Sequence, residues 1–119
     1  MPSVLIADDA AFMRMMLRNI LADAGYEVVG EAEDGADAVA KYRELRPDLT
    51  TMDITMPGMS GLEALRAICE EDPSARVIMC SAMGQKSMVV ESFSSGARDF
   101  IVKPFQAERV VSAVEKALL

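Results

Sequence analysis

The sequence predicts an α/β domain, a doubly wound five-stranded parallel sheet with helices on both faces. Short apolar segments that suit buried strands alternate five times with segments whose apolar residues recur every three or four positions. The connections between these segments are short, and such alternation favours a parallel sheet. A length of 119 residues, 51% of them hydrophobic and 26% charged, fits a single folded domain over residues 1–119.

The first strand is predicted at residues 4–7, a continuous apolar run that ends at Asp8 and Asp9 and suits a strand covered on both faces. A helix follows and ends with Gly25 as its C-terminal cap. The spacing of its apolar residues predicts a core-facing side made of Met13, Met16, Leu17, Ile20, Leu21 and Ala24. The opposite side is predicted to present Arg14, Arg18 and Asp23.

The second strand is predicted at residues 26–32, and a turn at Asp34 leads into a helix that ends at Arg46. Proline disfavours helical geometry in the residue before it, which is why the helix stops there. The apolar face of this helix is predicted to contain Ala38, Val39, Tyr42 and Leu45. The third strand, residues 49–53, is mostly apolar or β-branched and ends at Asp53, shortly before a Pro-Gly turn.

Ser60 and Glu63 match a capping box, which predicts the start of the third helix. That helix ends at Asp72, and its inward residues are predicted to be Leu62, Leu65, Ile68 and Cys69. The fourth strand is predicted at residues 76–80, before Ser81, and the fifth at 99–102, before Lys103 and Pro104.

The segment between the last two strands, residues 85–95, has poor helix propensity and no clean apolar stripe. We expect a marginal, partly exposed helix there. The final helix begins at about Gln106 and is predicted to pack through Val110, Val111, Val114 and Leu118.

Charge and composition exclude several classes of function. Twelve Lys and Arg against nineteen Asp and Glu give a net charge of −7, which disfavours binding to nucleic acid or to an anionic membrane surface. No apolar run is long enough to span a bilayer and no signal-peptide pattern opens the chain, so we expect a cytoplasmic protein. The absence of histidine removes His-ligated zinc and the Ser-His and Cys-His nucleophilic pairs.

Polar side chains follow four of the five predicted strands, and the carboxyl ends of parallel strands meet at one edge of a sheet. This edge is predicted to gather Asp8, Asp9, Asp53, Ser81 and Lys103. Singly, each residue also suits an ordinary role as a helix cap, a turn residue or a solvated lysine. Three neighbouring carboxylates, however, repel by ~4 kcal/mol per pair at 4 Å and an effective dielectric constant of 20, so a cation is expected.

An oxygen-rich site without histidine suits Mg²⁺, which uses one or two carboxylates together with water and phosphate oxygens. With Mg²⁺ and Lys103 neutralising the surrounding charge, one carboxylate can attack a phosphoryl group. The sequence therefore predicts Asp53 as the nucleophile of an aspartyl-phosphate reaction.

These residues resemble the receiver domain of two-component response regulators over essentially the whole chain. The resemblance rests on the acidic pair at 8–9, the segment at 53–58, Ser81-Ala82 and Lys103-Pro104. The longer strings at 8–14, 80–85 and 99–105 most resemble the single-domain chemotaxis members of the family, of the type found in Bacillus and Thermotoga. The resemblance, and not the residue pattern, implies a flavodoxin-like fold with strand order 2-1-3-4-5 and no output domain.

By this resemblance, Asp53 accepts a phosphoryl group from a histidine kinase of the chemotaxis type. Asp9, Asp53 and the backbone carbonyl of Thr55 would bind Mg²⁺, and Asp8 would act mainly through water. The missing histidine agrees with a donor on another protein. The protein would be a monomeric phosphoacceptor for signalling, which catalyses only its own phosphorylation and dephosphorylation.

The resemblance also implies a switch. The hydroxyl of Ser81 and the backbone N–H of Ala82 would contact the phosphoryl oxygens, and Lys103 would pair with them. Phe100 would turn inward when Ser81 moves, and the Lys103–Pro104 bond is often cis in the family. The weak helix at 85–95 would form the output surface for a flagellar motor switch protein, and a phosphatase is a further possible partner.

Three other classes of protein share part of this pattern. A phosphorelay intermediate or other stand-alone receiver would share every site residue. An aspartate-nucleophile phosphatase of the haloacid dehalogenase class would need a second Asp two residues after Asp53, where Thr55 stands. A flavin-binding protein would need a phosphate-binding loop where Asp8 and Asp9 stand, and two carboxylates there would repel the cofactor phosphate.

Overall fold

A parallel five-stranded sheet with the strand order β2-β1-β3-β4-β5 forms the centre of the molecule, and strands alternate with five helices along the chain. The computed structural model describes residues 1–119. The predicted fold class and the strand order implied by the family resemblance are both confirmed. The strands are β1 (Ser3–Ala7), β2 (Glu27–Ala32), β3 (Leu49–Asp53), β4 (Val77–Ser81) and β5 (Asp99–Val102). The helices are α1 (Ala11–Asp23), α2 (Gly35–Leu45), α3 (Gly61–Glu71), α4 (Lys86–Ser94) and α5 (Ala107–Ala117).

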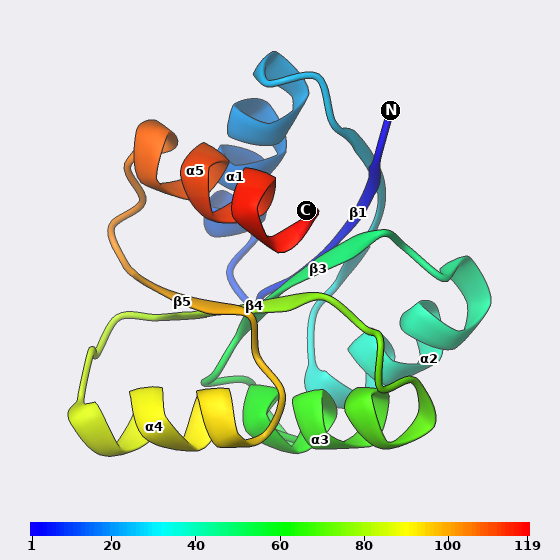
Figure 1. The fold of residues 1–119 in the computed structure, drawn as a ribbon, viewed down its shortest axis with the longest axis vertical. Coiled ribbons are helices and arrows are strands. Elements are labelled where there is room, and N and C mark those ends of the chain that lie inside the picture. The colour runs from blue at the N-terminus through cyan, green and yellow to red at the C-terminus, as the bar shows by residue number, and fades with distance from the viewer.

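Helices cover both faces of the sheet: α1 and α5 lie on one side, and α2, α3 and α4 lie on the other (Figure 1). Successive strand residues point to opposite faces, so each strand contributes to two cores. Val4 and Ile6 of β1 belong to the core beneath α1 and α5, whereas Leu5 and Ala7 belong to the core on the other face. This double burial explains the continuous apolar runs of the sequence.

Helix α1 differs from the prediction at two residues. Ala24, expected to face the core, is exposed, because α1 ends at Asp23 and Ala24 is already its C-terminal cap. Arg14, expected on the solvent side, is buried and lies on the same helical stripe as Leu17 and Leu21. Gly25 follows the cap with φ of +91°, a left-handed conformation that glycine adopts without steric cost.

Side-chain caps begin two of the helices, and the sequence predicts the one at Ser60. The Asp34 carboxylate accepts a hydrogen bond from the Asp37 N–H at the start of α2, over 2.8 Å. At the start of α3, the Ser60 hydroxyl accepts one from the Glu63 N–H over 3.2 Å. The return bond of a capping box is absent, because the Glu63 carboxylate contacts the Ser60 hydroxyl, at 3.5 Å, and not its backbone N–H.

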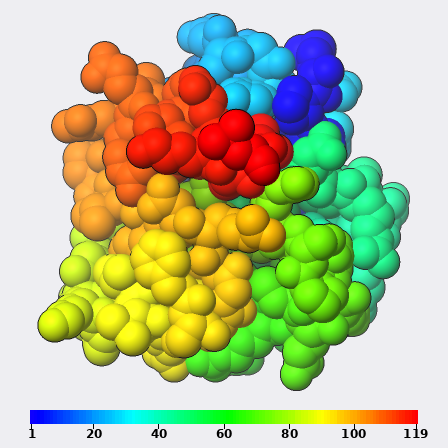
Figure 2. Space-filling model, viewed as in Figure 1, coloured from blue at the N-terminus to red at the C-terminus, as the bar shows by residue number.

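Helix α4 is largely exposed, in agreement with the partly exposed helix that the sequence predicts, and Ser92 is its only buried residue. An ion pair between Arg66 of α3 and Glu91, 2.7 Å long, links it to its neighbour. In Figure 2, α4 and α5 both reach the surface of one face of the molecule, with the β5 segment between them. None of the five helices combines the length and apolar character needed to cross a lipid bilayer.

Candidate functional site

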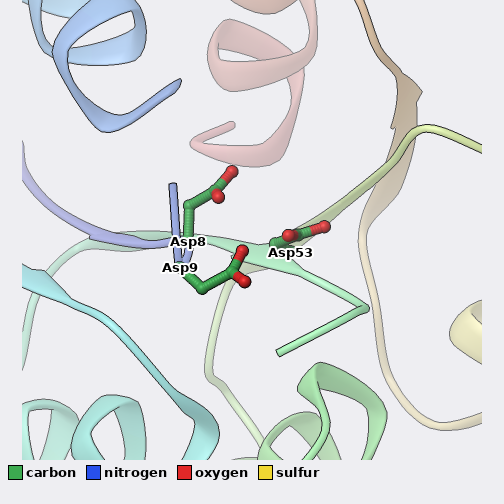
Figure 3. A group of neighbouring side chains, drawn as sticks. All are labelled: Asp8, Asp9 and Asp53. Atoms are coloured by element: carbon green, nitrogen blue, oxygen red, sulfur yellow. The ribbon is translucent and has the colours of Figure 1, made fainter. Parts of the chain in front are cut away.

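The carboxyl ends of β1 and β3 bring three aspartates together. Ala7 pairs with Met52 in the sheet, so Asp8, just after β1, lies beside Asp53, the last residue of β3. One carboxylate oxygen from each of Asp8, Asp9 and Asp53 lies within 4.8 Å of the other two. Figure 3 shows the three side chains reaching into the same region from the two strand ends. The predicted acidic cluster is therefore present.

Lys103 reaches this cluster from the end of β5. Its Nζ atom lies 2.7 Å from Oδ2 of Asp8 and 3.4 Å from Oδ2 of Asp53. The peptide bond between Lys103 and Pro104 is cis, in agreement with the family resemblance. Burial alone would lower the pKa of Lys103, but the hydrogen bond to Asp8 and the attraction of both carboxylates outweigh burial and raise it. The lysine therefore remains a fixed positive charge within the cluster.

Asp8 and Asp9 are held very differently. Asp8 is 1% exposed, its N–H donates to the Ala32 carbonyl over 3.0 Å, and its carboxylate accepts bonds from the Ala10 N–H and from Lys103. Asp9 is exposed, and its side chain makes no hydrogen bond within the chain. One member of the acidic pair is thus fixed, and the other is open to an incoming ligand.

Asp53 is buried, with 6% of its surface exposed. Burial raises its pKa; attraction to Lys103 opposes the change, and repulsion from Asp8 and Asp9 adds to it, so that the net effect is a raised pKa. The ionised carboxylate of Asp53 therefore lies in surroundings that disfavour its charge. Such a group gains from a bound cation.

The loop after Asp53 is fixed by close backbone packing. The N–H of Ile54 donates to the Cys80 carbonyl over 3.0 Å, and the N–H of Gly61 donates to the Ile54 carbonyl over 2.8 Å. A Cβ atom on Gly61 would lie 1.9 Å from the carbonyl oxygen of Asp53, so only glycine fits there. Thr55 lies in this loop and is exposed.

The remaining predicted residues, Ser81, Ala82 and Phe100, make no hydrogen bond to the carboxylates. Ser81 is the last residue of β4 and is 3% exposed, and its hydroxyl accepts a hydrogen bond from the Met83 N–H over 3.1 Å. Ala82 is exposed beside it. Phe100 lies inside, 7% exposed, in the core beneath α2, α3 and α4. The structure thus places Ser81 at the end of the strand next to β3, with Ala82 just after that strand, and Phe100 three residues before Lys103.

The chemistry of the cluster fits Mg²⁺. Its side-chain ligands are carboxylate oxygens only, with no nitrogen or sulfur donor among them, and Asp9 is open to solvent. Hard oxygen donors with room for water are the preferred surroundings of Mg²⁺ in proteins. The Cys80 thiol adjoins Asp53 in the sheet, but burial raises its pKa to about 12, so it offers no thiolate.

A sequence profile of the family described as the response regulator receiver domain matches residues 4–115. The chain belongs to this family. It is 62% identical over 113 residues to the chemotaxis protein CheY of Thermotoga maritima, and the matched region covers 95% of this chain and 94% of the relative. It is 63% identical over 115 residues to the CheY protein of Bacillus subtilis, covering 97% and 96%. It is therefore a CheY-like receiver domain, as the resemblance suggests.

Among solved structures, the chain is similar to one in the CheX-CheY-BeF₃-Mg²⁺ complex from Borrelia burgdorferi. The TM-score is 0.96 at 39% identity, and the match covers 98% of this chain and 89% of the other.

One residue at the site escaped the sequence analysis. The Nη1 atom of Arg14 donates a hydrogen bond to the carbonyl oxygen of Asp8 over 2.7 Å. The signal was present, because Arg14, Leu17 and Leu21 follow one another at spacings of three and four, the period of a buried helical stripe. Its charge, however, favoured a solvent position.

Proposed function

We propose that this receiver domain accepts a phosphoryl group on Asp53 from a phosphohistidine of a histidine kinase, in a reaction that depends on Mg²⁺. The observation that carries this proposal is the convergence of Asp8, Asp9, Asp53 and Lys103 at one edge of the sheet. Three carboxylates balanced by one lysine leave negative charge that a divalent cation would neutralise.

The reaction transfers a phosphoryl group from a histidine nitrogen of the donor to a carboxylate oxygen of Asp53. A carboxylate oxygen of Asp53 attacks the phosphorus atom, the new P–O bond forms, and the P–N bond of the donor phosphohistidine breaks. The bonding electrons return to the imidazole of the kinase, which takes up a proton from solvent when needed. Because this chain has no histidine, the donor is a separate protein or a small acyl phosphate.

Asp9, Asp53 and the carbonyl of Thr55 would bind Mg²⁺, and Asp8 would act through water. Bound there, the cation would supply positive charge that offsets the carboxylates and the phosphoryl oxygens. Lys103, already 3.4 Å from Asp53, would pair with a phosphoryl oxygen. Ser81 and the N–H of Ala82 would donate to the others, which requires the Ser81 hydroxyl to leave its present bond with Met83.

We further propose that the phosphorylated form binds a flagellar motor switch protein and thereby controls chemotaxis. The support is the high identity to CheY proteins over nearly their whole length. Phe100 would couple the two sites, because it is three residues from Lys103 and belongs to the core cluster against which the partly buried Met88 and Val89 of α4 pack. We expect a phosphatase partner to shorten the signal, an expectation that accords with the likeness to the CheX-bound chain.

Acetyl phosphate, or beryllofluoride as a phosphoryl mimic, tests the acceptor role. With Mg²⁺, acetyl phosphate should add one phosphoryl group to the wild type, as measured by intact-protein mass spectrometry, and Asp53→Asn should gain none. Equal gain in the variant would refute the assignment. A pull-down with the motor switch protein then tests the output: binding that does not increase on phosphorylation would favour a phosphorelay intermediate.

A phosphatase for outside substrates is disfavoured by Thr55, which stands where the general acid of that class would be. Steady hydrolysis of small phosphate esters that persists in Asp53→Asn would reverse this conclusion.

A further inference from the structure

We infer that Arg14 is a positioning residue for the acidic pair: it fixes the peptide between Asp8 and Asp9 and so orients Asp9 for Mg²⁺. The inference rests on the proposed role of this pair in binding Mg²⁺. It adds a residue on α1 that makes no contact with the phosphoryl group or the metal in the proposed mechanism.

Arg14 spans two elements with one guanidinium group. Its Nη1 atom donates to the carbonyl oxygen of Asp8 over 2.7 Å, and its Nε atom donates to Oε1 of Glu31 on β2 over 2.9 Å. The side chain is only 11% exposed. A buried, planar donor with two bonds in different directions has little freedom to move, so the Asp8 carbonyl is held at a fixed distance from β2.

The Asp8 carbonyl belongs to the peptide group that joins the two aspartates. The orientation of this peptide group determines the position of the Asp9 Cα atom and the direction of its side chain. Asp8 itself is already held by Ala32, Ala10 and Lys103. Asp9 makes no side-chain hydrogen bond, so its direction depends on the backbone alone. Arg14 is the only side chain that donates a hydrogen bond to that peptide group.

The charge of Arg14 is balanced locally. Arg18 also pairs with Glu31, over 2.6 Å, and Glu33 lies 3.6 Å from Arg14, so two arginines face two glutamates. Burial would raise the pKa of Glu31, but hydrogen bonds from Arg18 and Arg14 lower it, so the carboxylate stays ionised. The effect of Arg14 on the acidic pair is therefore expected to come from geometry more than from net charge.

Arg18 provides a matched control, because it binds the same carboxylate, is exposed and does not touch Asp8. The test compares Arg14→Met, Arg14→Lys and Arg18→Met by NMR. In metal-free protein, the Ala10 amide, which bonds the Asp8 carboxylate, should exchange with solvent roughly tenfold faster in both Arg14 variants and at the wild-type rate in Arg18→Met.

A Mg²⁺ titration followed through the Asp9 and Ala10 amides should give roughly tenfold weaker binding in the Arg14 variants. Lysine keeps the charge but lacks the planar group whose separate Nε and Nη1 donors make the two bonds, so Arg14→Lys should resemble Arg14→Met, not the wild type. If Arg14→Met fails to fold, the lysine variant decides.

Wild-type exchange and wild-type Mg²⁺ affinity in Arg14→Lys would overturn the inference, as would an equal loss in Arg18→Met. A wild type that binds no Mg²⁺ would instead refute the proposed function, while the exchange measurement in metal-free protein would still test the contact between Arg14 and Asp8.

Discussion

Replacing Asp53 with asparagine should stabilise the metal-free protein while abolishing phosphorylation. Each neighbouring carboxylate lies within 4.8 Å and repels Asp53 by about 3.5 kcal/mol at an effective dielectric constant of 20, whereas Lys103 at 3.4 Å attracts it by about 5 kcal/mol. The two repulsions exceed the attraction by roughly 2 kcal/mol, so the negative charge of Asp53 is destabilising. Water around the exposed Asp9 screens one of the repulsions and reduces this difference. We expect Asp53→Asn to gain about 1–2 kcal/mol in free energy of unfolding.

Thermal unfolding followed by circular dichroism in the presence of EDTA measures this gain. For a chain of 119 residues, about 1–2 kcal/mol corresponds to a rise in Tm of about 4–8 °C. Asp23→Asn is the matched control, because it removes the same unit of charge from an exposed side chain of α1 that makes no ion pair. Its Tm should stay within about 2 °C of the wild type.

Mg²⁺ should reverse the order of the two Tm values, so that the wild type becomes more stable than Asp53→Asn. A ligand that binds only the folded state at 100 times its Kd adds about 2.7 kcal/mol, so the wild type should gain several degrees and Asp53→Asn much less. An asparagine variant with an unchanged or lower Tm in EDTA would refute the reasoning, because it would mean that the lysine and the fold already neutralise Asp53. Equal gains from Mg²⁺ in both proteins would remove Asp53 from the metal site.

Three further predictions concern Thr51, Cys80 and Asp99. The Thr51 hydroxyl is buried without a hydrogen-bond partner, so Thr51→Val should raise the free energy of unfolding in urea by about 1–3 kcal/mol; a loss would show that the hydroxyl is satisfied. Cys80, with a pKa of about 12, should resist iodoacetamide at pH 8 in the folded protein and react after denaturation, as peptide mass spectrometry can show. Burial would raise the pKa of Asp99, but hydrogen bonds from Arg109 and from the Phe100 N–H lower it. The ionised Asp99 therefore stabilises the fold at any pH above the pKa of an unfolded aspartate, about 4, and this contribution is lost as the pH falls through the lower pKa of the folded state. The stability difference between wild type and Asp99→Asn should therefore be constant near neutral pH and shrink below pH ~4, and a difference independent of pH would contradict this assignment.

The sequence predicted the elements well because β1, β3 and β4 are buried on both faces and polar residues follow four of the five strands. The apolar runs mark the five strands, and the parallel arrangement brings Asp8, Asp53 and Lys103 to one edge. The order of the strands could not be derived from the pattern, because residues that face helices on both sides look alike in every strand. That order came only with the family resemblance.

Details that depend on tertiary partners were missed. Arg14 was expected in solvent because a lone charged residue is rarely buried, and its two partners, Glu31 and the carbonyl of Asp8, become neighbours only when β2 packs beside β1. The end of α1 was placed one residue too late for a similar reason, since a small apolar residue such as Ala24 fits either a helix face or a cap. The sequence likewise did not indicate that the Ser81 hydroxyl bonds the Met83 N–H.

Lys103 connects the acidic site to the rest of β5, and its position suggests how a charge on Asp53 is passed on. The Nζ atom of Lys103 is closer to the Asp8 carboxylate, at 2.7 Å, than to the Asp53 carboxylate, at 3.4 Å. The backbone N–H of Lys103 donates to the Ser81 carbonyl over 2.8 Å. An acyl phosphate on Asp53 would carry close to two negative charges in place of the one on the carboxylate, together with three acceptor oxygens, which would shift the balance of attraction toward Asp53. Because the ends of β4 and β5 are joined by that backbone bond, we expect the shift to move both strand ends together. Phe100 lies on the same short strand, so its packing against the core beneath α4 is the contact that such a movement would change first.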